Sequence, residues 1–399
     1  SKEIERQSRQ TRKLGYTFLD PILKHPGRYF VRESETNVEN GLSRLLKWGC
    51  IASIDFIISL LLLVRWNLIN DFARKFYSFR ANETIHVLKN IDAVYVKGGG
   101  FLHAYGAITD FYQMYYSLFL VNLAIRYRKP IYFLPNSIGP LHGFFTRRLV
   151  AYALKNALFI SVREHISKDY LRKELHIKCK YFADLGYHLE NRSNIAISDY
   201  LPEKKIQRRK LVGITLRPWR FPESKSPREK IDNYIQAFVK FVDYLELNNY
   251  YVCLFVHTLG PSAHENDEIA VDKVYEKLEN RNSCTIVKDP DLSCYDMMRL
   301  YSRCDYFVGT RFHSVIFAQN QGIPTIAISY GGNKGNGIME DLGLSQFVIG
   351  ITELSFEKLL VAFNEMKRQA DTYRTILSEH NENMLTNRSS LIEELKQYV

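Results

Sequence analysis

Short, uninterrupted apolar runs alternate with helical patterns along most of the chain, and this alternation restricts the fold more than any other feature. The runs form two series, at residues 92–100, 130–140, 157–164 and 178–189, then at 211–219, 250–260, 284–290, 305–311 and 324–332. Continuous apolar runs are typical of strands buried on both faces of a parallel sheet, with helices as crossovers. The sequence therefore predicts an α/β fold of two Rossmann-like doubly wound domains facing a cleft, with ligands at the carboxyl ends of the strands.

The break between the two series divides the chain into domains. Residues 191–210 lose the periodicity and gain charge, proline and asparagine, which indicates an interdomain linker. We therefore predict an N-terminal Rossmann-like domain over residues 1–190, a C-terminal one over 211–354, and C-terminal helices over 355–399. The first 90 residues show no opening strand.

One apolar run, residues 48–64, stands apart from the predicted strands. It has 17 residues, contains Asp55, and is bounded by Arg44, Lys47 and Arg65. That length is at the lower edge of what spans a bilayer, and an aspartate near the centre is costly there. A buried or interfacial helix is the better interpretation, and its basic flanks suit an anionic membrane surface.

Composition narrows the compartment and the partners. The apolar content of 46% and charged content of 24% are those of a soluble globular protein. A net charge of +11 favours acidic partners, but the basic residues are spread and no nucleic-acid motif occurs, so we expect no nucleic-acid binding. Six scattered cysteines without metal-ligand spacing indicate reduced thiols, no metal site and a cytoplasmic protein.

The segment "GTRFHS" places Arg311 and His313 where an apolar strand gives way to a helix. Backbone N–H groups at the start of a helix, together with a guanidinium, form an anion site that needs no metal. A histidine beside that site can deliver a proton at neutral pH. The alternative is a surface arginine and a helix-capping histidine, and the sequence leaves both interpretations open.

A glycine-rich loop, "YGGNKGNG", follows the next predicted strand. Gly331, Gly332 and Asn333 allow close approach of the backbone to a ligand, and Lys334 adds a positive charge opposite Arg311. The alternative is a plain flexible connection between a strand and a helix.

Other strand ends carry further candidates. Arg217 and Arg163 end two strands, where a cation has little reason to be buried unless it meets an anion; for Arg163 a salt bridge to Asp184 or Glu164 is an equal alternative. His257 ends another strand and has a core histidine as its alternative. No GxSxG nucleophile motif occurs, and these cations favour a metal-independent transfer.

Several motifs together resemble the polysaccharide pyruvyl transferase family. They are "GGGFLH", "PNSIGP", "SVREHISKDYL", "ADLGYHL", "GITLRPW" and "GTRFHSVIFAQNQGIPTIAISYGGNKGNGIMEDLGL". The resemblance covers roughly residues 90–345 and is most specific in the last motif, whereas the first 90 residues depart from it.

This resemblance implies a GT-B-like enzyme that uses phosphoenolpyruvate as co-substrate and requires no cofactor or metal. The product would be a cyclic pyruvate ketal on a sugar of a cell-surface polysaccharide or of its lipid-linked precursor. His313 would be the acid and Arg311 would hold the donor anion, with the remaining C-terminal candidates and Arg163 as donor-binding residues. Acceptor-side candidates are Gly99, Gly100, His103, Asp110, Asn136 and His142.

Two points remain open at this stage. The base is one of His103, Asp110, His142 and His257. A nucleotide-sugar-dependent GT-B glycosyltransferase, in which the same arginines would hold a diphosphate, is the alternative function. If the acceptor is a lipid-linked oligosaccharide, we expect a cytoplasmic protein that is peripheral on the inner face of the membrane, with residues 48–64 as the contact.

Overall fold

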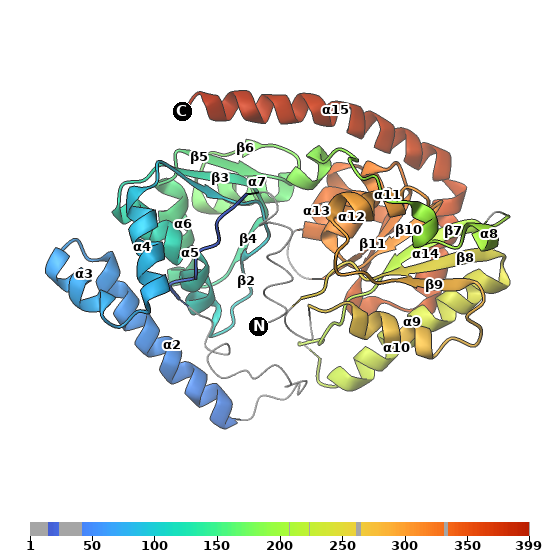
Figure 1. The fold of residues 1–399 in the computed structure, drawn as a ribbon, viewed down its shortest axis with the longest axis horizontal. Helices are drawn as coiled ribbons and strands as arrows, with labels where there is room; N and C mark the ends of the chain where they lie inside the picture. The colour runs from blue at the N-terminus through green and yellow to red at the C-terminus, as the bar shows by residue number, and fades with distance from the viewer. Residues whose placement is uncertain are drawn as a thin grey trace. The chain divides into compact units, whose positions relative to one another are not determined.

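The computed structural model describes residues 15–23, 42–206, 208–222, 224–260, 265–330 and 334–398, leaving aside the side chains of 42–45, 334 and 335. The fold divides into two compact units (Figure 1). The N-terminal unit comprises Thr17–Phe182 and Leu395–Val399, and the C-terminal unit comprises Ala183–Glu394. Both are α/β units built on parallel sheets, as the apolar runs predict.

The N-terminal unit has a four-stranded parallel sheet in the order β1-β3-β5-β6. The strands are β1 (Val94–Val96), β3 (Ile131–Asn136), β5 (Phe159–Val162) and β6 (Lys180–Tyr181). A separate parallel pair joins β2 (Leu102–Ala104) to β4 (Ile138–Leu141). The helices are α2 (Leu42–Leu63), α3 (Asn67–Arg74), α4 (Phe79–Asn90), α5 (Asp110–Arg126), α6 (Phe144–Lys155) and α7 (His165–Tyr170). In the described part of the chain, only helices precede β1, in agreement with the missing opening strand.

The C-terminal unit has a six-stranded parallel sheet in the order β12-β11-β10-β7-β8-β9. The strands are β7 (Lys210–Thr215), β8 (Tyr250–Phe255), β9 (Cys284–Val287), β10 (Tyr306–Gly309), β11 (Thr325–Ser329) and β12 (Val348–Gly350). The chain adds strands to one side of β7 and then, from β10 onwards, to its other side. The reversal between β7 and β10 is the topological switch point at which doubly wound sheets bind ligands.

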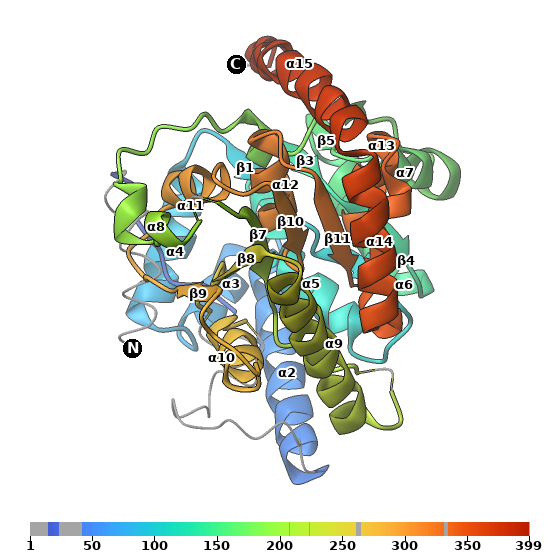
Figure 2. The same cartoon turned by 90° about the vertical axis from the view of Figure 1, so that its right-hand side faces the viewer.

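Helices cover both faces of this sheet (Figure 2). One face packs against α9 (Pro227–Leu247), α10 (Glu268–Glu276) and α14 (Phe356–Arg368), and the other against α11 (Cys294–Tyr301), α12 (Phe312–Asn320) and α13 (Lys334–Asp341). Alternate residues of β7 supply the two cores, with Val212 and Ile214 on one side and Leu211 on the other. Gly213 has no room for a side chain, because a Cβ there would lie 2.6 Å from the ring of Phe307.

The boundary between the units falls at residues 182 and 183, whereas the sequence predicts it after residue 190. Residues 183–190 belong to the C-terminal unit because they pack against α15 (Ala370–Lys396), where Asn387 Oδ1 accepts a hydrogen bond from Ala183 N (3.1 Å). The predicted linker is also attached to this unit, since Arg299 Nε donates to the carbonyl of Ile195 at 2.9 Å. The charged and polar composition of residues 191–210 predicts a linker, but the same composition also suits a segment that packs along the surface of a unit.

The predicted C-terminal helices are α14 and α15, and the chain end after them is part of the N-terminal unit. There, Tyr132 Oη donates to the carbonyl oxygen of Tyr398 at 3.0 Å, and the two rings meet edge to face. The end of the chain therefore packs against the N-terminal unit, although the rest of that unit ends at Phe182, more than 200 positions earlier.

Candidate functional site

The loops after β7 and β10 are tied together at the switch point. The two strands pair in parallel, with Ile214 opposite Val308. Beyond the pairing, Thr310 N donates to Thr215 Oγ1 at 3.1 Å and Thr310 Oγ1 donates to the Thr215 carbonyl at 2.9 Å. Arg217 and Arg311 follow directly on these loops, so the fold brings the two predicted arginines to the same strand ends.

Within the part of the chain that the structure describes, Arg217 is a buried cation with no carboxylate paired to it. The residue is only 8% exposed, and its guanidinium carbon lies 3.8 Å from the ring centre of Tyr330 and 4.8 Å from that of Trp219. Its Nε is buried and has no hydrogen-bond partner among the described residues. Burial lowers the pKa of Arg217, and the nearby charge of Arg311 lowers it further. A buried charge normally has a hydrogen-bonded counter-ion, and among the described residues Arg217 has none.

Arg311 is held rigidly by Asp267. Its Nε and Nη2 both donate to Asp267 Oδ1, at 2.8 and 2.6 Å, and Asp267 Oδ2 accepts from Thr258 N at 3.0 Å. Burial raises the pKa of the Asp267 carboxyl to about 6, although the charge of Arg311 opposes the change. The carboxylate thus fixes the direction of the guanidinium while offsetting part of its charge.

Helix α12 begins at this point with Arg311 as its N-cap residue, and no side chain caps it. The positive end of the helix dipole is therefore directed at the same strand ends as the two arginines. A pocket lies beside it between α12, the end of β11 and α13. It is lined by Arg311, Phe312, Val315, Ile316, Ala327, Ile328, Ser329, Tyr330, Ile338 and Met339, so its walls are mostly apolar with Arg311, Ser329 and Tyr330 as polar groups.

The glycine-rich loop is only partly described. Gly331, Gly332 and Asn333 lie outside the described residues, and of Lys334 only the backbone, which begins α13, is described. Tyr330, directly before the loop, covers Arg217. The roles of these four residues therefore stay predictions.

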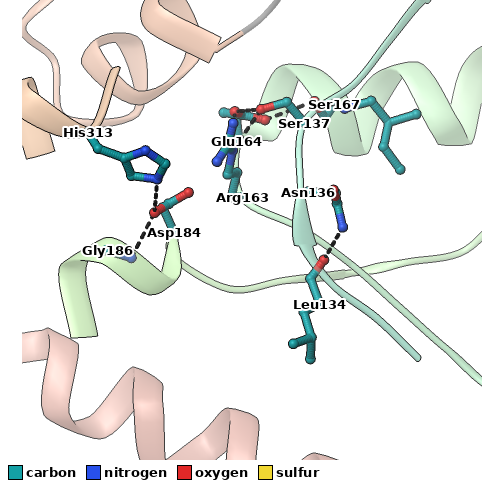
Figure 3. A network of polar contacts seen from close by, with 10 residues as sticks. Leu134, Asn136, Ser137, Arg163, Glu164, Ser167, Asp184, Gly186 and His313 are labelled. Atoms are coloured by element: carbon teal, nitrogen blue, oxygen red, sulfur yellow. Dashed lines mark hydrogen bonds and ion pairs between the residues drawn. The ribbon is translucent and has the colours of Figure 1, made fainter. Parts of the chain in front are cut away.

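His313 faces a carboxylate that the sequence did not single out for it (Figure 3). Its Nε2 lies 3.7 Å from Asp184 Oδ1; the histidine side chain is 51% exposed and the aspartate is buried. Asp184 Oδ1 also accepts from Gly186 N at 2.7 Å. Gly186 permits this approach, because a Cβ there would lie 3.2 Å from Ile316 Cγ2 and 3.4 Å from His313 Cδ2. The motif "ADLGYHL" is thus a support for the histidine on α12.

His257 has the geometry of a core histidine. Its Nδ1 pairs with Tyr301 Oη at 2.8 Å, and its ring packs against Phe317. Burial, followed by the charges of His313 and Arg311, lowers the pKa of His257 to about 3. It is therefore neutral at physiological pH, and the geometry favours the structural alternative over a clamp on an anion.

Arg163, in the N-terminal unit, already has a counter-ion (Figure 3). Its Nε donates to Glu164 Oε1 at 3.1 Å and to Ser137 Oγ at 2.7 Å, and both charged side chains are fully buried. Ser167 Oγ donates to Glu164 Oε2 at 2.9 Å. Burial raises the pKa of Glu164 to about 7, against the effect of Arg163. The geometry favours the salt-bridge alternative, in which "PNSIGP" and "SVREHIS" are joined by an internal polar network.

Three of the acceptor-side candidates have backbone or internal roles. Asp110 Oδ2 accepts from Gly106 N and Ala107 N, at 2.8 and 2.9 Å, and so closes the loop before α5. Asn136 is fully buried and donates to the carbonyl of Leu134. A Cβ on Gly99 would press on the ring of Phe101 at 2.9 Å. For Gly100, next to Gly99 in the same run, the structure gives no contact that decides its role.

His103 lies in β2 and His142 directly follows β4; these two strands pair in parallel, and His142 N donates to the carbonyl of Ala104 at 2.9 Å. His142 is exposed, and the ring of His103 packs against Tyr105. Of the acceptor-side candidates, His142 is the exposed one, whereas His103, Gly99 and Gly100 are half-buried.

The model of the polysaccharide pyruvyl transferase family matches residues 18–332. The chain belongs to this family. A curated relative is amylovoran biosynthesis protein AmsJ of Erwinia amylovora, 25% identical over 283 residues, which are 69% of this chain and 66% of the relative. The match thus spans slightly less than two thirds of that relative's length.

Solved structures similar to this pyruvyl transferase family member show its fold class. UDP-GlcNAc 2-epimerase from Neisseria meningitidis, bound to UDP-GlcNAc, has a TM-score of 0.50 and 12% identity, with 92% of this chain and 84% of that chain covered. Trehalose 6-phosphate synthase from Burkholderia multivorans has a TM-score of 0.51 and 9% identity, with 85% and 78% covered. With these neighbours, the two Rossmann-like units have the GT-B fold predicted from the sequence.

Sequence reasoning did not assign the roles of four residues of the site in this family member. Asp184 and Asp267 support His313 and Arg311, and Trp219 and Tyr330 enclose Arg217. Asp184 and Trp219 stand inside quoted motifs, so a signal existed for both. Asp267 gave none, because its pairing with Arg311 is made across 44 residues of chain.

Proposed function

We propose that the protein transfers the pyruvyl group of phosphoenolpyruvate to two hydroxyls of one sugar, in a polysaccharide or its lipid-linked precursor, to form a cyclic ketal. The family implies a transferase with a polysaccharide substrate. The single observation that supports the donor is Arg217, a buried guanidinium between two aromatic rings with an unpaired Nε. Phosphoenolpyruvate presents a phosphate and a carboxylate on one carbon and so requires more than one cation.

The two arginines divide this work. Asp267 accepts two hydrogen bonds from Arg311, which fixes the orientation of the guanidinium and offsets part of its positive charge. Arg217 has no carboxylate at hydrogen-bond distance among the described residues, so no such partner offsets its positive charge. We assign the phosphate to Arg217 and the start of α12, and the carboxylate to Arg311. Arg163 has no donor role in this proposal.

His313 is the proposed acid. Its proton goes to the methylene carbon of phosphoenolpyruvate, which becomes a methyl group, and the adjacent carbon becomes electron-deficient. One sugar hydroxyl adds to that carbon, the carbon–oxygen bond to phosphate breaks, and the second hydroxyl adds in its place. A base accepts each hydroxyl proton in turn; one of these protons then returns to His313 and the other leaves with the phosphate. Asp184, 3.7 Å from His313 Nε2, attracts the protonated ring and fixes its orientation.

The base that takes the hydroxyl protons is a second proposal. Between His103 and His142, the exposed His142 is the better candidate, since its loop position is fixed by the hydrogen bond to Ala104. His257 is unsuitable, because its lowered pKa of about 3 makes it too weak a base. We propose a cytoplasmic location, where phosphoenolpyruvate is available.

A thermal-shift assay with phosphoenolpyruvate and with UDP and CDP sugars tests the donor directly. A ligand at one hundred times its dissociation constant adds about 2.7 kcal/mol, which corresponds to roughly 5–10 °C for a unit of this size. The expected result is a shift with phosphoenolpyruvate that is absent in Arg217→Ala and in Arg311→Ala. A shift only with a nucleotide sugar would refute the donor.

The nucleotide-sugar glycosyltransferase remains the second candidate because of one feature. The pocket beside α12 has apolar walls, including Val315, Ile316 and Ile338, which suit a flat base better than a small acid. The same arginines would then bind a diphosphate. The nucleotide-sugar arm of the assay decides between the two donors.

A further inference from the structure

The outer side of helix α2 is mainly apolar over residues 46–63, where the polar side chains of Lys47 and Ser53 are also exposed. Leu46, Ile54, Ile57, Leu60 and Val64 are all exposed, and they recur at the spacing of one helix face. A window of 18 residues, Leu46–Leu63, has a mean hydropathy of 1.9, and only 11% of it is buried. An exposed apolar surface of this size normally marks an interaction site.

The opposite side of α2 is already in use. Phe56 meets the rings of Tyr115 and Phe111 edge to face, at 4.6 and 5.9 Å between ring centres. Ser59 and Leu62 are fully buried, and Ser59 Oγ pairs with Tyr115 Oη at 2.7 Å. Because one side is packed on α5, α2 is fixed to its unit as a half-covered helix and is not a separate span.

Helix α3 extends the same surface at a rigid corner. The buried Asn70 donates to the carbonyls of Leu61, Val64 and Trp66, at 3.1, 2.8 and 3.0 Å, which joins the end of α2 to α3. Beyond the corner, Leu68, Phe72, Phe76 and Phe79 are exposed, Leu68 to 86%. We call the exposed apolar residues of α2, α3 and the start of α4 the apolar platform; the two helices form the outer edge of the N-terminal unit (Figure 1).

The charges around the platform are mainly positive. Residues 46–80 contain five basic side chains (Lys47, Arg65, Arg74, Lys75 and Arg80) and two acidic ones (Asp55 and Asp71), a difference of three positive charges. Two copies of such a surface repel each other, whereas an anionic bilayer attracts it. Trp66 is exposed at the corner, and tryptophan favours the boundary between headgroups and acyl chains.

We propose that the apolar platform docks on the surface of an anionic lipid bilayer, with the outer face of α2 and α3 inserted among the headgroups. The packed side of α2 leads towards the acceptor-side loops, because Phe56 meets Phe111 and Phe111 also meets the ring of Phe145 on α6, three residues after His142. Docking therefore presents those loops to a lipid-linked sugar; this last step rests on the proposed function, but the docking itself does not.

Vesicle flotation of the whole chain tests the proposal, with phosphatidylcholine vesicles that contain or lack phosphatidylglycerol. The double variant Ile57→Gln, Leu68→Gln removes two exposed platform side chains (61% and 86% exposed). The matched control, Val361→Gln with Leu247→Gln, removes two equally exposed apolar side chains (70% and 86%) from the C-terminal unit. Neither pair includes a residue of the switch point, and an unchanged melting temperature without ligand serves as the test of an intact fold.

Wild type and control are expected to float with the anionic vesicles, less at high salt, and the platform variant to bind on the order of tenfold more weakly. Wild-type protein that stays in solution with anionic vesicles overturns docking, as does equal binding by platform and control variants. A dimer that the platform variant breaks, without vesicle binding by wild type, also overturns it and assigns the surface to a second copy. Wild-type protein that floats but shows no thermal shift with phosphoenolpyruvate refutes the proposed donor and leaves the docking proposal intact.

Discussion

Replacing Arg217 by methionine should separate a ligand clamp from a structural arginine. Methionine has a similar length and can remain between Trp219 and Tyr330, but it carries no charge and no N–H group. The guanidinium is buried, and its Nε has no partner among the described residues. Its removal therefore relieves an unfavourable burial while it deletes the proposed contact with the donor.

The expected magnitudes follow from the contacts. An unpaired buried donor costs about 1–3 kcal/mol, and each cation–π contact that is lost contributed about 0.5–2 kcal/mol. Contacts of the new sulfur with the two rings return about 0.3–1.5 kcal/mol, so we expect the free energy of unfolding to change by less than about 1 kcal/mol. Loss of a charge-assisted hydrogen bond, about 1.5–3 kcal/mol, should raise the dissociation constant for phosphoenolpyruvate roughly 10- to 150-fold.

Denaturant unfolding gives the first quantity and calorimetric titration with phosphoenolpyruvate the second. Arg163→Met is the matched control, because it also removes a buried arginine at a strand end. It breaks the pair with Glu164 and should cost about 3–5 kcal/mol above the pKa of that carboxyl, without weakening phosphoenolpyruvate binding by the folded fraction. A loss of about 3 kcal/mol or more in Arg217→Met, or an unchanged dissociation constant, would refute the reasoning.

Three further substitutions test the roles of buried carboxylates. Asp184→Asn should lower kcat by roughly ten- to a hundredfold through misorientation of His313, while the thermal shift with phosphoenolpyruvate persists; loss of that shift would make Asp184 part of the donor site. Asp267→Asn should lower the free energy of unfolding by about 3 kcal/mol, because Arg311 loses its buried partner, and a neutral effect in a denaturant titration would contradict this. Burial raises the pKa of Glu164 to about 7, so the folded state binds its proton more tightly than the unfolded state does. The free energy of unfolding should therefore fall as pH rises from about 4.5 to about 7, and Glu164→Gln should lack that slope; equal slopes in both proteins would count against it.

The fold was readable from the sequence because its strands are apolar on both faces. The runs at residues 211–219, 250–260 and 305–311 each contain a strand of the C-terminal sheet, and only parallel strands under two helical layers need such continuity. The position of the unit boundary was not readable. Ala183 belongs to the C-terminal unit, where it donates a hydrogen bond to Asn387. That partner lies about 200 residues away in the sequence, and no local pattern encodes the contact.

The candidate site was predictable where an arginine or a histidine at the end of a strand is sufficient to identify a site residue. Arg217, Arg311 and His313 follow the carboxyl ends of β7 and β10, and the topology alone brings them to the switch point. Their partners required the structure, since Asp184 and Asp267 reach them from other loops. Whether a strand-end arginine binds a ligand or an internal carboxylate depends on those partners.

The contrast between Arg163 and Arg217 shows how local sequence decides that question. Arg163 is followed at once by Glu164, which folds back on it with two serines, so its charge is satisfied inside the unit. Arg217 is followed by a proline and Trp219, which offer a ring and no anion, and Arg311 beside it adds to the excess of positive charge. Two arginines with one buried carboxylate and an uncapped helix start leave this switch point short of negative charge. A donor that carries a phosphate and a carboxylate would supply that charge, as would the diphosphate of a nucleotide sugar. The buried Nε of Arg217, which has no partner among the described residues, is therefore the strongest indication of an anionic donor.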